Sequence, residues 1–280
     1  MKKILYISLI AIAFIGASCT ERINVKLGSG KQQVVFFGVI TNETKAHSIS
    51  ITRSSDYFDE ATSVGFSGAT VTVDDGEKTI VLTENPSKKG EYLTPADYTG
   101  LINHTYKMVA KVNVDGQIKT YTASSLLKAP MTMDSIQVER DNDRKGWNLK
   151  LYAYEPPTKD FYMFKAYKNN ILLSDTLNEA TYTDDILVNG RYSNGFSAYF
   201  LTDEKPDEII KKGDNMSLEI FSITEEFMYF LYDVQLETTP KTPLFSGPSA
   251  NVRTNITGEN AFGFFTAYSS TKKSAVYQGN

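Results

Sequence analysis

The sequence predicts a mainly β protein: an antiparallel β-sandwich over residues 34–127 and a second antiparallel β domain over residues 128–280. From Val34 onward, short runs rich in β-branched and aromatic residues recur between polar turns, a pattern typical of strands. Even spacing of such strands, with no helical pattern between them, is typical of antiparallel sandwiches. A helical period occurs only near residues 224–237, which predicts one amphipathic helix in the second domain.

The first 18 residues have the organisation of a signal peptide. Two lysines follow Met1, and Ile4–Ile15 is an almost wholly apolar run. This run is too short to span a bilayer, which needs about 20 apolar residues. Three small residues then precede Cys19, the only cysteine of the chain. We therefore interpret residues 1–18 as an export signal.

Two interpretations of the cleavage site remain open. Gly16 and Ser18 satisfy the small-x-small rule of ordinary secretion, but that cleavage would leave a free thiol in an exported protein with one cysteine. Attachment of lipid to Cys19 gives the thiol a role as a membrane anchor. The segment resembles a lipobox, although Gly16 stands where leucine is favoured. We expect a lipidated cell-envelope protein.

Composition sets limits on the mature chain. Residues 19–33 are polar after the cysteine and lack a sustained period, so we expect a tether reaching at most about 45–50 Å. The chain has 29 basic and 33 acidic residues, and loss of the signal segment removes two lysines. This acidic balance does not favour a nucleic-acid partner. The hydrophobic content of 41% is sufficient for packed cores.

The first domain is expected to contain hairpins. Asp75-Gly76 and Asp115-Gly116 each stand between two strand-like runs, which is a strong short-range hairpin signal. The expected strands are 34–40, 49–51, 69–73, 80–82, 105–114 and 117–123.

Lys128-Ala129-Pro130 is interpreted as a connector to the second domain. Pro156-Pro157, Asn189-Gly190 and Asn194-Gly195 mark turns there. The expected strands are 135–139, 147–154, 160–173, 196–201, 216–223 and 262–269.

The predicted helix follows the strand at 216–223. Ser222 and Glu225 have the spacing of a capping box. Four apolar residues from Phe227 to Val234 then recur at i, i+3, i+4 and i+7, and Pro240 ends the segment. We expect this apolar stripe to pack on the second sheet.

Motifs that carry metal or phosphate chemistry are incomplete. His47 and His104 are the only histidines and fall in separate segments, so a zinc or copper site lacks ligands. The Asp141–Gly146 segment departs from a calcium loop at Lys145 and is interpreted as a turn. Gly28–Lys31 lacks the serine or threonine of a phosphate-binding loop. We expect neither a metal nor a cofactor.

Catalytic constellations are also missing from the sequence. There is no Gly-x-Ser-x-Gly elbow, and neither histidine has an evident partner. Asp74-Asp75 and Asp184-Asp185 stand beside turn residues, where acidic side chains are common. We expect a protein that is not an enzyme. An envelope hydrolase would require a pair of carboxylates that meet in a cleft.

Tyr57 and Phe58 are the candidate binding residues. Both fall in a polar loop after a strand, where aromatic side chains can anchor a ligand or partner. The alternative is that they fold back over the edge of the sandwich.

The assembled segments resemble a family of Bacteroidota lipoproteins classed as a domain of unknown function and often encoded beside TonB-dependent receptors. The likeness covers nearly the whole mature chain. The segments that carry it are 67–76, 90–95, 106–125, 134–136, 213–224, 248–256 and 263–269. The resemblance implies an immunoglobulin- or fibronectin-like N-terminal sandwich, an outer-membrane location and, by gene association, an accessory role to a TonB-dependent transporter.

Two functional hypotheses follow. The leading one is a non-enzymatic outer-membrane lipoprotein that binds a TonB-dependent transporter or its ligand. The alternative is a stand-alone surface module that binds a glycan or a host protein through Tyr57 and Phe58. Glu21 is the only acidic residue directly after Cys19, so the surface or periplasmic face stays open.

Overall fold

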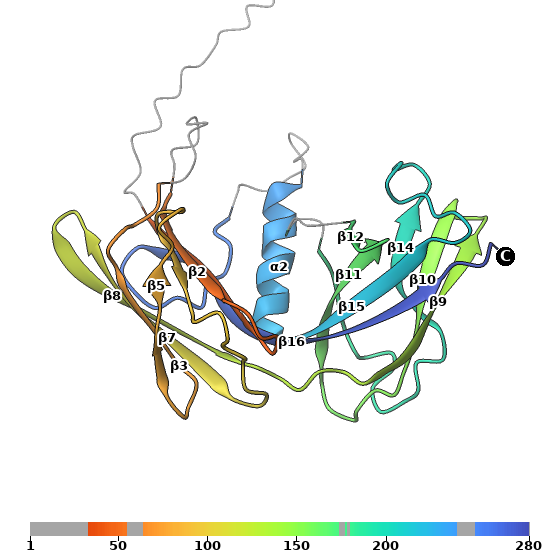
Figure 1. Cartoon of the computed structure of the whole chain (residues 1–280), viewed down its shortest axis with the longest axis horizontal. Helices are drawn as coiled ribbons and strands as arrows, with labels where there is room; N and C mark the ends of the chain where they lie inside the picture. The colour runs from red at the N-terminus through yellow and green to blue at the C-terminus, as the bar shows by residue number, and fades with distance from the viewer. Residues whose placement is uncertain (1–32, 55–63, 174–176, 178–179, 240–249, 280) are drawn as a thin grey trace, which may run out of the picture. The chain divides into compact units, whose positions relative to one another are not determined.

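The computed structural model describes residues 33–54, 64–173, 177, 180–239 and 250–279, all within one unit of the chain, residues 32–280. Their regular structure consists of sixteen β-strands and one α-helix, α2 (Figure 1). This confirms the prediction of a mainly β fold with one helix. Within the described residues, no helix has the length and apolar character needed to cross a membrane.

The largest sheet has nine strands and draws on both halves of the chain. Its order is β12-β11-β15-β16-β1-β2-β6-β5, and β13 pairs with β11. The strands taken from the first half are β1 (Val34–Thr41), β2 (Ser48–Arg53), β5 (Thr83–Glu84) and β6 (Glu91–Leu93). Those from the second half are β11 (Phe161–Lys168), β12 (Ile171–Leu172), β13 (Thr181–Asp184), β15 (Asn215–Ile223) and β16 (Ala261–Val276).

Two smaller sheets complete the structure. The first has the order β4-β3-β7-β8 and consists of β3 (Thr70–Asp74), β4 (Thr79–Val81), β7 (Thr105–Val114) and β8 (Gln117–Leu126). The second has the order β14-β10-β9 and consists of β9 (Met133–Asp141), β10 (Gly146–Ala153) and β14 (Phe196–Thr202).

The last strand, β16, joins the two parts of the nine-stranded sheet. Residues 261–268 pair in parallel with β1, and residues 269–276 pair antiparallel with β15. The sequence predicted only 262–269 as strand, because the polar run after Ser269 shows no apolar alternation. Backbone hydrogen bonds to β15 hold this polar segment as a strand, although its side chains give no strand signal. The parallel β1–β16 pair departs from the expected all-antiparallel pairing, and it is possible because most of the chain forms the crossover between them.

The first core lies between the β3–β7–β8 sheet and the β1–β2–β16 part of the large sheet. Alternate residues of β7, Tyr106 to Val112, are buried in one cluster with Phe36, Ile49 and Phe265 of the opposing strands. Two sheets thus share one apolar layer, as a sandwich requires. The finer assignment to an immunoglobulin- or fibronectin-like sandwich stays a prediction.

A second core lies between the β14–β10–β9 sheet and strands β11 and β15. Trp147, Leu149 and Leu151 of β10 are buried with Tyr162 of β11 and Leu218 of β15. The predicted boundary between residues 127 and 128 falls in the connection from β8 to β9. Strand β16 pairs with β1, which precedes this boundary, and with β15, which follows it. The division into domains 34–127 and 128–280 therefore stays a prediction.

Helix α2 (Glu225–Thr238) covers the face of the large sheet opposite these cores (Figure 1). Phe227, Phe230 and Leu231 are buried against Phe264 of β16 and Phe161 of β11, as the predicted stripe required. Burying side chains of this size is worth about 1.5–3 kcal/mol each, which exceeds the differences of up to about 0.7 kcal/mol in helix propensity among ordinary residues.

The capping residue differs from the prediction. Thr224 is the N-cap, and its side-chain oxygen accepts a hydrogen bond of 3.3 Å from the backbone N–H of Phe227. Ser222 is still in β15, buried, and its Oγ accepts from the backbone N–H of Met131. The sheet therefore extends to Ile223 and takes Ser222 out of the helix.

Turn residues behave largely as the sequence predicted. Asp115 and Gly116 both have positive φ, at 52° and 85°, and join β7 to β8 in a two-residue hairpin. The strand predicted at 160–173 is wrong in one respect. Asn169 and Asn170 also have positive φ, so they form a turn that separates β11 from β12.

Candidate functional site

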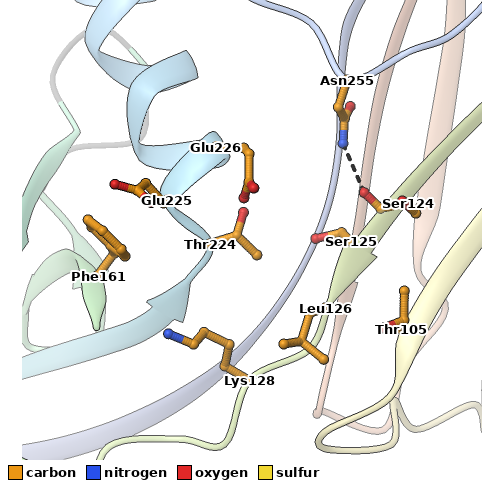
Figure 2. A pocket seen from close by; sticks show the side chains of 10 residues that line it. All are labelled: Thr105, Ser124, Ser125, Leu126, Lys128, Phe161, Thr224, Glu225, Glu226 and Asn255. Carbon is orange, nitrogen blue, oxygen red and sulfur yellow. Dashed lines mark hydrogen bonds between the residues drawn. The ribbon is translucent and has the colours of Figure 1, made fainter. Parts of the chain in front are cut away.

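A groove lies between the N-terminal end of α2, the end of β8 and the start of β11 (Figure 2). Its volume is about 470 Å³. Ser124–Leu126 of β8 and Thr224–Glu226 of α2 line it, together with Lys128 and Phe161. The groove therefore exposes hydroxyl, carboxylate and ammonium groups on a surface that is mostly apolar.

The wall formed by β8 is fixed by contacts to β16. The Oγ of Ser125 accepts a hydrogen bond of 2.9 Å from the backbone N–H of Ala267. Asn255 links the same two strands, because its Nδ2 donates to the carbonyl oxygen of Ser124 in β8 (3.2 Å) and to that of Phe265 in β16 (2.7 Å). These contacts hold the end of β8 in place and give the groove a rigid side.

Charges around the groove are only partly paired. Glu225 accepts from Lys159 Nζ at 2.7 Å, and the ammonium of Lys128 contacts Asp160. Glu226 is exposed at the helix end, where the dipole of α2 favours a negative charge. The arrangement can donate and accept several hydrogen bonds, which suits recognition of a segment that carries polar groups beside apolar ones.

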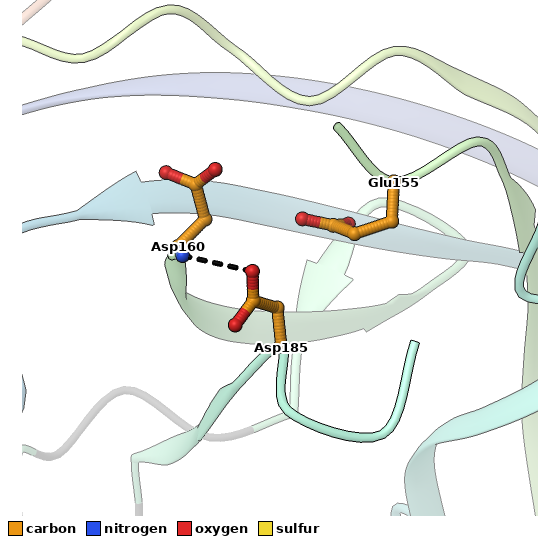
Figure 3. Close-up of side chains that lie close together, drawn as sticks. All are labelled: Glu155, Asp160 and Asp185. Atoms are coloured by element: carbon orange, nitrogen blue, oxygen red, sulfur yellow. Dashed lines mark hydrogen bonds between the residues drawn. The ribbon is translucent and has the colours of Figure 1, made fainter. Parts of the chain in front are cut away.

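Three carboxylates meet a short distance from the groove, at Glu155, Asp160 and Asp185 (Figure 3). Glu155 follows β10, Asp160 precedes β11, and Asp185 follows β13. One oxygen of each residue lies within 4.8 Å of one oxygen of each of the others. We call these three residues the acidic cluster. None of them lines the groove.

Glu155 is the most buried member of the acidic cluster, at 1% exposure. Burial raises the pKa of Glu155 to about 7, although the hydrogen bond from Tyr162 acts to lower it. That bond, from the Tyr162 hydroxyl to Oε1, is 2.6 Å long. The other oxygen, Oε2, is buried and has no hydrogen-bond partner among the described residues.

Asp185 is placed by the turn that follows β13. The backbone N–H groups of Val188 and Asn189 both donate to its carbonyl oxygen at 2.8 Å. Its carboxylate Oδ2 accepts from the backbone N–H of Asp160 at 2.9 Å and from Asn189 Nδ2 at 3.0 Å. The sequence identified Asp184-Asp185 as turn residues, but it did not show that Asp185 turns inward to meet Glu155.

Asp160 is the member of the cluster with a cationic partner. The Lys128 ammonium contacts its Oδ1, and the Thr158 hydroxyl donates to its Oδ2 at 2.5 Å. Lys128 also lines the groove, so the lysine side chain connects the acidic cluster with the groove.

The candidate residues named from the sequence lie outside the described part of the chain. Cys19 belongs to residues 1–32, and Tyr57 and Phe58 belong to residues 55–63. Their roles stay predictions.

The two histidines have separate structural partners. His47 is buried, and its Nδ1 accepts from the backbone N–H of Thr41 at 3.3 Å. His104 Nδ1 hydrogen-bonds the carbonyl oxygen of Asp75 at 2.8 Å. Among the described residues, neither belongs to a group of side chains with metal-ligand geometry.

The chain belongs to a family described as a domain of unknown function, DUF4249, whose model matches residues 20–274. The predicted membership of such a family is therefore confirmed over most of the chain. Comparison with curated proteins gave no match.

Proposed function

We propose that the protein is a non-enzymatic lipoprotein of the cell envelope that binds a TonB-dependent transporter or the ligand of that transporter. Lipid on Cys19 would hold it at the outer membrane. The structural observation that carries the binding role is the groove between β8 and α2. The signal-like segment that ends at Cys19 supports the anchored location.

The groove suits a partner that presents a segment with both apolar and polar side chains. Its sides come from a rigid strand and a helix end, so little conformational entropy is lost when they bind. Leu126 supplies an exposed apolar contact, at 39% exposure, in the same groove as the carboxylate of Glu226. Such a mixture of apolar surface with polar groups around it is typical of transient interfaces between proteins.

Site-specific crosslinking tests this role. A photoreactive amino acid at position 226 of the full lipidated chain should capture a transporter in the native outer membrane. The same group at position 171, which is exposed on β12, is the matched control and should capture much less. Cys19→Ala should reduce capture at position 226 by removing the anchor. Equal capture at both positions, or none, would count against the proposed groove.

A stand-alone glycan-binding module is the second candidate. Tyr154 and Tyr192 form an isolated β-bridge and are 59% and 46% exposed. Exposed tyrosines on a fixed backbone can serve as anchors for a ligand. Binding to a glycan array that disappears in Tyr154→Ala, without loss of stability, would favour this candidate over the transporter partner.

A further inference from the structure

The oxygens of the acidic cluster are close enough to share one cation. Calcium binds carboxylate oxygens at about 2.3–2.6 Å, so two of its ligands are separated by at most roughly 5 Å. The oxygens of Glu155, Asp160 and Asp185 lie within 4.8 Å of one another. Glu155 and Asp160 belong to the connection between β10 and β11, and Asp185 follows β13, so one ion could join these two segments.

Burial makes the cluster costly without a compensating positive charge. Glu155 and Asp185 are only 1% and 2% exposed. Within the described part of the chain, Lys128 forms an ion pair with Asp160 and with neither of the other two carboxyl groups, so a single ammonium faces all three. Buried carboxylates this close repel each other strongly in a low-dielectric environment.

One oxygen points independently to a ligand. Glu155 Oε2 is buried and has no hydrogen-bond partner among the described residues, whereas Oε1 accepts from Tyr162. In Figure 3 the carboxylate of Glu155 is directed toward those of Asp160 and Asp185. A buried acceptor without a donor costs free energy that coordination of a metal ion would recover.

The donor set favours calcium over other ions. Every side chain in the cluster offers oxygen, and zinc and copper select nitrogen or sulfur. Magnesium keeps several of its waters in a strict octahedron, whereas calcium accepts irregular sets of protein oxygens. The burial of Glu155 and Asp185 fits the ion that needs fewer waters.

We propose that Glu155, Asp160 and Asp185 bind a calcium ion. The ion would tie the segment between β10 and β11 to the turn after β13. Lys128, which lines the groove, contacts the same Asp160, so calcium would compete with this ammonium for the carboxylate and displace a groove side chain.

Calorimetric titration of the full chain in detergent, first stripped with a chelator, tests the proposal. We expect one calcium site and a rise in melting temperature that excess chelator reverses. Glu155→Gln removes a negative charge without breaking a hydrogen bond to the backbone. It should weaken calcium binding at least tenfold. Asp185→Asn should weaken it similarly.

Asp141→Asn is the matched control. Asp141 ends β9 just before a turn, and its carboxylate accepts from Arg144 N–H and Asn148 Nδ2 at 3.0 Å each, but it lies outside the cluster. This variant should bind calcium as the wild type does. A calcium concentration of about 10 mM exceeds the dissociation constants of extracellular calcium modules, so absence of binding at that concentration would overturn the proposal. Binding that is unchanged in Glu155→Gln would overturn it as well.

Discussion

The hydroxyl of Tyr98 donates a hydrogen bond of 3.0 Å to Oδ2 of Asp75 in the interior of the first core. Asp75 is fully buried, and its Oδ1 accepts from the backbone N–H groups of Glu77 and Lys78. Burial acts to raise the pKa of Asp75, but these hydrogen bonds outweigh it and the pKa is lowered. The β3–β4 turn is therefore held by an ionised carboxylate inside the protein.

Tyr98→Phe should destabilise the protein by about 1.5–3 kcal/mol, because it leaves a buried carboxylate oxygen without its donor. Urea unfolding at pH 7 measures the change. Tyr232→Phe removes a hydroxyl from a tyrosine that is half exposed on α2, and it should alter stability by less than about 0.5 kcal/mol. Equal effects of the two substitutions would contradict the role of the Tyr98–Asp75 bond.

His47 should make stability depend on pH. Burial lowers its pKa below the ordinary value of 6.5, so the folded protein holds the ring neutral while the unfolded chain takes up a proton. The contribution of His47 is complete above pH 6.5 and is lost as the pH falls toward the lowered folded pKa, at up to about 1.4 kcal/mol per pH unit.

His47→Asn tests that sign. The amide oxygen of asparagine can accept from Thr41 N–H, as Nδ1 does, but it does not titrate. We expect the free energy of unfolding of the variant to change less between pH 7.5 and 5.5 than that of the wild type. Parallel curves for the two proteins would show that another group controls this range.

Gly263 should tolerate no side chain. Its φ is 91°, and a Cβ there would lie 1.8 Å from the carbonyl oxygen of Phe36 on β1. Gly213 has a similar φ of 94° but open space around it. Gly213→Ala should cost about 1–2 kcal/mol from backbone strain alone. Gly263→Ala should cost clearly more or prevent folding, as measured by urea unfolding.

Hydrogen exchange tests whether Thr224, the observed N-cap, or Ser222, the predicted one, caps helix α2. Thr224→Ala should destabilise α2 by about 1 kcal/mol and speed exchange of the Phe227 amide. Ser222→Ala should instead expose the Met131 amide, which donates to its Oγ, and leave the Phe227 amide protected. The reverse pattern would restore the capping box expected from the sequence.

Local signals in the sequence predicted local structure well. The β7–β8 hairpin follows from strict alternation around Asp115-Gly116, and helix α2 follows from the stripe that begins at Phe227. Asn169-Asn170 carried a turn signal too, but the apolar residues on both sides of it concealed the break. These features depend on neighbours within a few residues, where period and turn chemistry decide the backbone.

Features that join distant segments could not be predicted. The second half of β16 is polar, and only its pairing with β15 makes it a strand. The acidic cluster requires Asp185 to meet Glu155 and Asp160 through the fold, and each residue alone has the appearance of an ordinary turn acid. Alternation and composition contain no information about which turns come together.

The parallel pairing of β1 with β16 has a consequence for how the protein folds. The first core includes Phe265 and Ala267 of β16, so its apolar layer stays incomplete until the end of the chain is present. The entropy of closing so long a loop is lost before these contacts form, which slows folding. A nascent chain that has emerged only as far as residue 250 would leave β1 as an open strand edge, prone to misassociation. The final strand therefore acts as the closing step of folding. Shortening it from residue 276 would remove the pairing with β15 first, and shortening it past residue 269 would open the edge of β1 as well.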